Sequence, residues 1–333
     1  MKVSVLITTY NLEQYIEHTL KTVLSQRLKA ELEILIGDDG SEDNTWSILQ
    51  EYQKKYPMLI QIFQMPRDLH EQYNRVERSA NNRLHLLKMA TGDYCTYLDG
   101  DDYYLSEEKL QKQLECLENK DNQDCVVCGH NLYLTYEDGT KVPLSRARKE
   151  RKYTKQQYWK WMFLQANAML FRNISKEHWP NGLTAKYFDD NNITYWLLQY
   201  GKLYYLPECM GAYRQVTGSS WNAIDRLQKA SSNMIGYSVE LELAPENRMI
   251  SDIRHFPDYA YLYRHRKEIN RESCAPFYET AEKNHLTEAM RVYQMNQGNA
   301  SEKCRMWFRY VRSALHYAIV KGQRALLKGI GQF

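Results

Sequence analysis

The stretch "GDYCTYLDGDDYYLSEEKL", residues 92–110, joins a short apolar run to a dense group of acids. The run from Tyr94 to Leu98 is rich in residues that favour β-strands. It ends directly in the sequence Asp99, Gly100, Asp101, Asp102. Three carboxylates within four residues repel one another, so the pKa of at least one must rise unless a cation neutralises them. The stretch therefore predicts a strand whose carboxyl end is a charged site.

The chain around this stretch alternates between strand patterns and helix patterns. β-prone runs at 2–9, 32–37, 58–64 and 93–98 are separated by segments whose apolar residues recur at helical spacing. Asn11 stands where it is expected to cap the first of these helices. Alternation with short connections predicts an α/β fold in which a mostly parallel central sheet carries helices on both faces.

Polar side chains gather after three of the expected strands, at residues 8–11, 38–41 and 99–102. In open parallel sheets, ligands bind beyond the carboxyl ends of the strands. Three such clusters in one half of the chain are therefore expected to form one binding site.

The acids after the fourth strand are typical of a divalent cation site. Asp99 and Asp101 are one residue apart and face the same side of an extended segment, while Gly100 allows a ligand to approach the backbone. Hard oxygen ligands suit Mg²⁺ or Mn²⁺, and Mg²⁺ usually completes its shell with waters and substrate phosphates. The pattern indicates a nucleoside diphosphate. No glycine-rich phosphate loop follows any strand, which argues against a dinucleotide dehydrogenase and a P-loop nucleotidase.

The pattern changes after about residue 123. The run "CVVCGHNLYLTYEDGTKV", residues 125–142, reads as a long strand with a hairpin turn at "EDG". A basic loop, "SRARKERKY", follows at 145–153, and the region from 222 to the end is expected to be helical.

Composition narrows the class of protein. The 333 residues carry a formal net charge of +3, too small by itself to indicate a nucleic-acid partner, so none is expected. The 27 tyrosines suit stacking on sugar rings, or they reflect ordinary use in the core and at its rim. The seven cysteines are scattered, and Cys125 and Cys128 lie in an apolar run, so buried thiols in a reducing compartment are expected.

No part of the sequence reads as a membrane span or a secretory signal. No apolar run approaches the roughly 18 to 20 residues that a transmembrane helix needs, and the apolar run at the start of the chain is short for a signal peptide. We expect a cytoplasmic protein that is soluble or bound peripherally to a membrane.

Three motifs in order resemble glycosyltransferase family 2, whose members have the GT-A fold. They are "VSVLITTYN" at 3–11, "EILIGDDGSEDNT" at 33–45 and "MATGDYCTYLDGDD" at 89–102. A later stretch at 188–221, beginning "FDDNNITYW", resembles the acceptor-side segment of the family. The resemblance implies a GT-A domain over 1–221. Its nucleotide-sugar half would be 1–122 and its acceptor half 123–221, followed by a helical region at 222–333.

The resemblance implies a metal-dependent hexosyl- or N-acetylhexosaminyltransferase that uses a nucleotide sugar, usually a UDP-sugar. Thr8 and Tyr10 fall where the family cradles uracil, and Asp39 would accept a hydrogen bond from the uracil N3–H. Its neighbour Asp38 would brace the loop instead. Arg83 stands where the family has the arginine of an A-R-N motif, here altered to N-N-R-L, and would contact the diphosphate.

The same resemblance assigns the acids of the D-x-D motif. Asp101 would ligate Mn²⁺ or Mg²⁺, and Asp99 would meet the ribose or a metal-bound water. Asp102 extends the cluster. Arg214 lies in a segment that matches a loop over the diphosphate, where it would aid the leaving group. A structural salt bridge is the alternative role for Arg214.

The family usually inverts the anomeric centre by direct displacement, which needs a base on the acceptor side. Asp190 aligns with the acidic residue of the family, and Asp189 beside it is the alternative. Either residue could instead cap the helix that begins near 191.

Two other functions compete with the transferase. A sugar-1-phosphate nucleotidylyltransferase needs a glycine-rich N-terminal loop with Arg and Lys, and "LITTYNLEQY" at 6–15 has neither. A non-catalytic protein that binds nucleotide sugars or glycans on a degenerate transferase fold is the second alternative. The presence of Asp39, Asp99, Asp101 and Asp190 argues against it.

The last 33 residues, 301–333, combine basic and apolar side chains without an acid after Glu302. A basic amphipathic helix containing Trp307 and Phe308 would suit a membrane interface. Family members often act on lipid-linked glycans at the inner face of the bacterial plasma membrane, which anionic lipid would favour. The alternative is a C-terminal helix that packs its apolar stripe on the protein.

Overall fold

The computed structural model describes residues 1–67, 75–216, 224–269 and 274–285, together with twelve scattered positions between 300 and 319. The chain divides into two compact units. The first unit comprises residues 1–158 and 163–217, and the second comprises 159–162 and 218–333. Each unit is described separately below.

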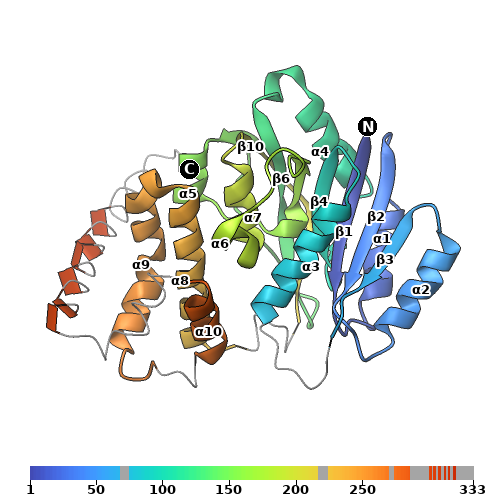
Figure 1. Ribbon diagram of the computed structural model, residues 1–333. Helices are drawn as coiled ribbons and strands as arrows, with labels where there is room; N and C mark the ends of the chain where they lie inside the picture. Colours follow the sequence, from blue (N-terminus) through green and yellow to red (C-terminus); the bar gives the residue numbers. More distant parts are fainter. Residues whose placement is uncertain are drawn as a thin grey trace. The chain divides into compact units, whose positions relative to one another are not determined.

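The first unit is built on one ten-stranded sheet (Figure 1). Its main path runs in the order β3, β2, β1, β4, β9, β6, β10, β5, while β7 pairs with β6 and β8 with β10. The strands are β1 (Lys2–Thr9), β2 (Glu31–Asp38), β3 (Ile60–Gln64), β4 (Tyr94–Asp99), β5 (Tyr103–Tyr104), β6 (Cys125–Tyr136), β7 (Lys141–Pro143), β8 (Arg151–Tyr153), β9 (Met169–Arg172) and β10 (Lys202–Gln215).

The predicted α/β class with a mostly parallel sheet is confirmed. Strands β3, β2, β1 and β4 pair in parallel, and so do β6 and β10. Strand β9 is inserted between these groups and runs antiparallel to both β4 and β6. The helices of this unit are α1 (Ile16–Leu24), α2 (Thr45–Lys55), α3 (Arg75–Met89), α4 (Lys109–Glu118), α6 (Gly182–Lys186) and α7 (Asp190–Leu197), with α5 (Lys155–Trp161) at its boundary.

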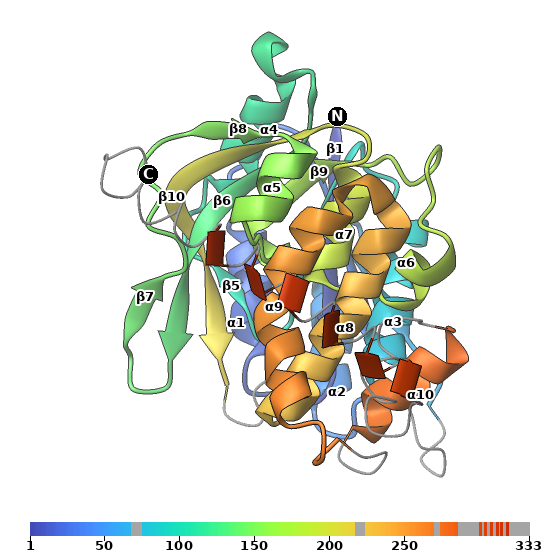
Figure 2. The same ribbon diagram turned by 90° about the vertical axis from the view of Figure 1, so that its left-hand side faces the viewer.

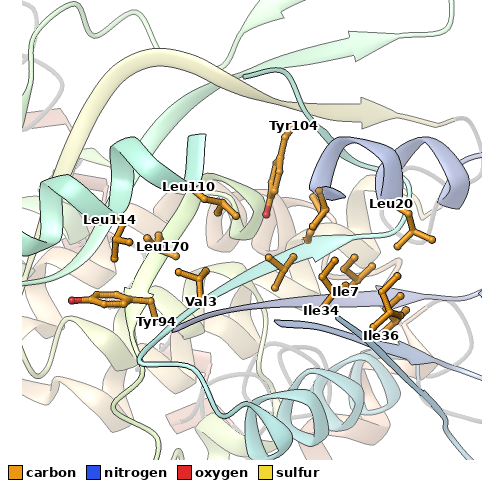
Figure 3. Close-up of a cluster of buried hydrophobic side chains, with 14 of the residues drawn as sticks. Val3, Ile7, Leu20, Ile34, Ile36, Tyr94, Tyr104, Leu110, Leu114 and Leu170 are labelled. Carbon is orange, nitrogen blue, oxygen red and sulfur yellow. The ribbon is translucent and has the colours of Figure 1, made fainter. Parts of the chain in front are cut away.

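The apolar runs form strands because both faces of the sheet are covered. Alternate residues of β1, such as Val3 and Ile7, pack with Leu20 of α1 and Leu114 of α4 on one face (Figure 3). Helix α3 lies on the other face, where the hydroxyl of Tyr97 donates to a carbonyl of this helix. Continuous burial on both faces explains why these strands lack a polar alternation.

The pairing register aligns the carboxyl ends of three strands. Thr8 of β1 lies opposite Asp99 of β4, and Thr9 lies opposite Asp38 of β2. All three expected polar clusters therefore meet at one edge of the sheet, as the alternation predicted.

The expected helix cap at Asn11 is wrong. Helix α1 begins at Ile16 without a side-chain cap, and Asn11 has a left-handed φ of 52°. Its side-chain oxygen accepts from the backbone N–H of Glu42 at 2.8 Å, and its own N–H donates to Ser41 Oγ at 2.9 Å. Asn11 therefore joins its own loop to the loop at 41–42 by hydrogen bonds. Asparagine suits this position because it tolerates the left-handed backbone conformation better than most residues.

The second unit is helical where it is described, as expected for the C-terminal region. It contains α8 (Arg226–Leu243), α9 (Arg248–Arg264) and α10 (Ala275–Lys283). Asp225 and Gln228 form a capping box at the start of α8. Buried Glu240 accepts a hydrogen bond from His255 at 2.8 Å. None of the described helices is long and apolar enough to cross a membrane. The finer division into donor, acceptor and membrane-associating segments stays a prediction.

A lysine without a charge partner lies inside the first unit. Lys109 opens α4, is 0% exposed, and its Nζ has no hydrogen-bond partner in the described structure. The Nζ lies 4.1 Å from the centre of the Tyr104 ring. Burial lowers the pKa of Lys109 to about 7, because the charged amine loses its hydration.

Lys109→Met is expected to raise the melting temperature, and more so at pH 6.5 than at pH 9. The folded-state pKa lies below the unfolded value, so the unfolded chain holds one more proton between about pH 7 and 10.5. Wild-type stability therefore rises through this window by up to about 1.4 kcal/mol per pH unit, and the advantage of methionine shrinks. Calorimetric melting at both pH values measures this.

Lys112→Met provides the matched control, because Lys112 is on the same helix but is exposed and paired with Glu208. This variant should show no comparable trend with pH. If the gain in melting temperature from Lys109→Met were constant or grew with pH, the conclusion that burial lowers the pKa of Lys109 would be contradicted.

Candidate active site

The turn after β4 is held close to the end of β1. The N–H of Gly100 donates to the Thr8 carbonyl at 2.8 Å, and Thr8 Oγ1 donates to Asp99 Oδ1 at 2.8 Å. A Cβ on Gly100 would lie 3.1 Å from the Thr8 carbonyl oxygen and from Leu12 Cδ1. This close approach therefore favours glycine at position 100. Thr8, expected at the uracil, orients a carboxylate of the D-x-D motif in this structure.

Asp102 faces the protein interior. It is fully buried, and it accepts from the backbone N–H of Arg214 at 2.9 Å and from Asn167 Nδ2 at 2.8 Å. Its own carbonyl accepts from Thr19 Oγ1 at 2.6 Å. Burial, followed by repulsion from Asp101, raises its pKa. Asp102 therefore joins the acidic turn to β10, and Asp99 and Asp101 are the acids of this turn that are not fully buried.

Asp101 carries negative charge that its surroundings do not neutralise. Burial, followed by repulsion from Asp99, raises its pKa to about 6, against an opposing effect of the Arg214 guanidinium. The described residues contain no group of three or more His, Cys, Asp or Glu arranged to hold a metal. Two carboxylates fit a cation that takes its remaining ligands from water and a diphosphate. The donor set thus fits Mn²⁺ or Mg²⁺.

Arg83 links an acid of the turn after β4 to an acid at the start of α7. Its guanidinium lies 3.1 Å from Asp99 and 3.4 Å from Asp190, and its side chain is only 10% exposed. Burial alone would lower the pKa of Arg83, but the carboxylates of Asp99, Asp190 and Asp189 raise it. The guanidinium expected at a diphosphate is thus engaged by carboxylates in this structure. Its role toward a diphosphate stays a prediction.

The two adjacent acids of α7 have different surroundings. Asp189 is the N-cap, and its Oδ1 accepts from the N–H of Asn192 at 2.9 Å. Asp190 is the first helical residue and extends to Arg83. Burial raises the pKa of Asp190, Arg83 lowers it, and Asp99 raises it again, with a net rise. The capping alternative therefore describes Asp189, and Asp190 joins the cluster.

A second group of side chains surrounds the loop after β2. Asp38 accepts from the N–H groups of Gly40 and Ser41, so it braces the loop. Asp39 Oδ1 accepts from Arg78 Nε at 2.7 Å, and Asp39 Oδ2 lies 3.4 Å from Arg67. These two arginines were not predicted, because both reach Asp39 from distant points in the sequence and follow no motif.

Tyr10 and Arg214 each lie in a cation–aromatic stack. The Arg67 guanidinium lies 4.1 Å from the centre of the half-exposed Tyr10 ring. The Arg214 guanidinium is 4.7 Å from the Tyr15 ring and 4.9 Å from the Tyr103 ring. Arg214 is therefore held by aromatic faces at the end of β10.

Parts of two expected features lie outside the described residues. The remainder of the segment expected over the diphosphate, 217–221, is among them. So is most of 301–333, including everything after 319. Of its described positions, Trp307, Phe308, Leu315 and Ile319 each expose about half or more of their surface.

Comparison with solved structures shows the fold. Residues 1–349 of S. aureus TarS, solved in complex with UDP-GlcNAc, align with a TM-score of 0.52 and 15% identity, over 89% of this chain and 92% of that one. The mannosyltransferase PcManGT from Pyrobaculum calidifontis, solved with GDP-Man and Mn²⁺, aligns with a TM-score of 0.52 and 13% identity, over 95% of this chain and 86% of that one. The GT-A fold implied by the motifs is confirmed.

Comparison with curated sequences finds more similar relatives. An uncharacterized protein of Mycobacterium tuberculosis is 28% identical over 238 residues, which is 66% of this chain and 60% of that protein. The dTDP-rhamnosyl transferase RfbG of Shigella flexneri is 29% identical over 150 residues, or 44% of this chain and 48% of its own length. The chain thus spans about half to three fifths of these relatives.

The family assignment follows from the sequence match over the region that carries the paired carboxylates. The family described as "Glycosyl transferase family 2" matches residues 4–179, more than half of the chain. This region contains β1, the loop after β2 and the acidic turn after β4, which hold the paired carboxylates described above. The chain therefore belongs to glycosyltransferase family 2.

Proposed function

We propose that this protein is an inverting glycosyltransferase that moves a sugar from a nucleotide sugar, specifically a UDP-sugar, to a hydroxyl group of a glycan or a lipid-linked glycan. The observation that carries the proposal is the junction of Asp99, Arg83 and Asp190, which brings a donor-side acid and an acceptor-side acid to one cation. The family assignment supports it. Structures of the same fold contain UDP-GlcNAc, or GDP-Man with Mn²⁺.

The surroundings of Asp39 favour a uracil base. The carboxylate is a hydrogen-bond acceptor flanked by the guanidinium donors of Arg67 and Arg78. Uracil presents the complementary order, with the N3–H donor between two carbonyl acceptors. The N3 of cytosine is an acceptor and would face the carboxylate, which is also an acceptor. Guanine would place its N2 amine, a donor, against one of the guanidinium donors, so either base would oppose like groups. Tyr10 supplies a ring on which a base can stack.

Asp101 and Asp99 would hold Mn²⁺ or Mg²⁺ together with the diphosphate oxygens. When bound, the ion supplies Lewis-acid stabilisation of the negative charge on the leaving nucleoside diphosphate. The raised pKa of Asp101 supports this role, because burial and the neighbouring Asp99 carboxylate disfavour its ionised form, which a bound cation would stabilise. Arg214, held between two tyrosines, would add a fixed positive charge beside the leaving group.

Asp190 would act as the base. Its carboxylate takes the proton from the acceptor hydroxyl while that oxygen bonds to the anomeric carbon, and the bond from this carbon to the phosphate oxygen breaks. A raised pKa brings the group closer to neutrality, where a general base works best. Asp189 is less suited, because one of its oxygens caps α7.

The site of action would be the cytoplasm, with attachment to the inner face of the plasma membrane through the tail at 301–333. The exposed rings of Trp307 and Phe308 support this attachment. Arg312, another described residue of the tail, is also exposed and would supply a positive charge toward anionic lipid.

Removal of the metal or of Asp101 is expected to abolish transfer. Asp101→Ala should lower turnover by about a hundredfold or more, because the site loses a ligand and a charge. Excess EDTA should have the same effect on the wild type, and Mn²⁺ or Mg²⁺ should restore activity. Release of UDP from a UDP-sugar measures this. Asp121→Ala removes an exposed acid as the control, and full activity in EDTA would refute the metal role.

Asp190→Asn is expected to remove transfer while leaving UDP affinity within about twofold of the wild type, because the base acts on the acceptor. Asp189→Asn is the matched control, since asparagine caps helices as well as aspartate does. Wild-type kcat should fall as the pH drops through the raised pKa of Asp190, since only the carboxylate accepts a proton. Proton NMR should show an inverted anomeric configuration in the product.

The opposite result for the two acids would exchange their roles. If Asp189→Asn were inactive and Asp190→Asn active, the base would be Asp189. A parallel loss of UDP affinity and turnover in Asp190→Asn, measured by calorimetry, would place Asp190 in the donor site instead.

Asp39→Asn is expected to weaken UDP binding by about tenfold or more, because a charged acceptor for the N3–H is lost. The affinity for CDP should change less, so the preference for UDP over CDP should narrow. Calorimetric titration of both nucleotides gives the ratio. An unchanged ratio would show that Asp39 does not read the base.

A further inference from the structure

A basic strap of the first unit stands apart from the acidic site. We define the basic strap as residues 141–152, which contain six Lys or Arg and one acid, Glu150. The formal net charge of the whole chain is only +3, so the rest of the chain is net negative. Positive charge is therefore concentrated in these twelve residues.

Most cations of the basic strap are exposed and have no acidic partner. Lys141, Arg146, Arg148, Lys149 and Arg151 are exposed, and none makes an ion pair with the described part of the chain. Lys152 is the exception, because it pairs with Asp124 at 2.9 Å. The acid Glu150 is engaged by the hydroxyl of Tyr204 at 2.6 Å. Five like charges in a short segment repel one another, which a polyanion would relieve.

The basic strap is fixed to the sheet. Buried Asn131 of β6 donates to the Ser145 carbonyl at 2.8 Å and accepts from the Ser145 N–H at 2.9 Å. The N–H of Leu144 donates to the Leu132 carbonyl at 2.9 Å. The far end is held by the pairing of β8 with β10. Fixed cations lose less conformational entropy on binding than cations on a loose loop.

The first residue of the basic strap, Lys141, lies near the edge of the sheet that carries the site. Arg214 lies opposite Thr135 of β6, and Thr135 lies opposite Lys141 of β7. Two strand spacings, about 10 Å, thus separate the backbones of Arg214 and Lys141. Figure 2 shows β7 beside the ends of β6 and β10, and β8 toward the opposite end of these strands.

The basic strap is long enough for an extended partner. Arg151 pairs with Tyr205, nine residues before Arg214 on β10. At about 3.3 Å per residue, the two ends of the basic strap lie about 30 Å apart along this strand. A compact ligand such as one diphosphate would contact only a small part of this length.

We propose that the basic strap binds an extended polyanionic acceptor, a chain of units joined by phosphodiester links, and leads its end to the site. This inference rests on the proposed transferase function for the identity of the bound chain as acceptor. The acidic turn and α7 present Asp99, Asp101 and Asp190 at the site, and these carboxylates repel a polyanion. Cations on the approach offset this repulsion, which is a general use of charged surfaces in steering.

A lipid surface fits these residues less well. The apolar side chains beside the cations are Tyr136, Val142 and Leu144, which expose 42%, 44% and 36% of their surface. More than half of each side chain is already covered, and none is Trp or Phe. Membrane-binding elements combine basic residues with apolar side chains that enter the acyl region. The composition of the basic strap instead matches a hydrated polyanion.

The test measures binding without a donor. Labelled long-chain inorganic polyphosphate is titrated into the full-length wild type and into the triple variant Arg146→Gln, Arg148→Gln, Lys149→Gln. The variant is expected to bind about tenfold more weakly, since three exposed ion pairs are lost. The slope of log affinity against log salt should become shallower by about two. Inorganic phosphate alone should compete poorly with the polymer.

A second triple variant, Lys29→Gln, Lys54→Gln, Lys120→Gln, changes the net charge equally at exposed positions elsewhere in the first unit. It should bind polyphosphate like the wild type. An equal loss in both variants would overturn the proposal, since net charge alone would then explain binding. Vesicles of phosphatidylglycerol and phosphatidylcholine form a further arm, and strap-dependent binding to these vesicles without binding to polyphosphate would also overturn it.

Failure of the proposed function is distinguished by its own measurement. UDP-sugar turnover by the wild type tests the transferase, whereas polyphosphate binding tests the basic strap and needs no donor. If the protein bound polyphosphate through the basic strap but showed no turnover, the basic strap would still be a polyanion-binding surface. The bound polyanion would then no longer be assigned as the acceptor of a transferase. Turnover in a protein that does not bind polyphosphate would overturn the strap proposal alone.

Discussion

The buried carboxylate of Asp102 is the constraint on which the acidic site depends. It has no cation of its own, and it is satisfied by the backbone N–H of Arg214 and the amide of Asn167. Such an arrangement fixes geometry, because a buried carboxyl group tolerates little displacement of its hydrogen-bond donors. The acidic turn, the end of β10 and the segment before β9 are thereby held at fixed positions relative to Asp99 and Asp101.

The acids on this edge of the sheet differ in role because their surroundings differ. Asp38 and Asp189 bind backbone N–H groups of their own loop or helix, and Asp102 joins three segments. Asp99 and Asp190 meet at Arg83, and Asp101 lies beside Asp99 in the acidic turn, so these three acids have the chemistry of a reaction site. The distinction lies in which groups donate to each carboxylate, since all of them are aspartates at the end of an element.

The sequence permitted a correct prediction of the fold class and of the edge where polar clusters meet, because both follow from local periodicity. The antiparallel insertion of β9 between β4 and β6 could not be predicted, since strand order depends on long-range packing. The same reason explains why the contacts of Arg67 and Arg78 with Asp39 were missed. The cap assigned to Asn11 failed because a loop-to-loop contact competed with the helix. The roles of the individual site residues stay predictions.

The position of Arg83 has a thermodynamic consequence for the order of events. One guanidinium serves both Asp99 and Asp190, so the two carboxylates share a single counter-charge. Neutralising Asp99 removes its repulsion of Asp190 and leaves more of the attraction of the Arg83 guanidinium to Asp190. Both effects favour the ionised form of Asp190. Binding of a cation at Asp99 and release of a proton from Asp190 are then linked by a coupling free energy, and the linkage is reciprocal. A cation bound at Asp99 would thus favour the ionised form of Asp190, whereas without it the pKa of Asp190 stays raised.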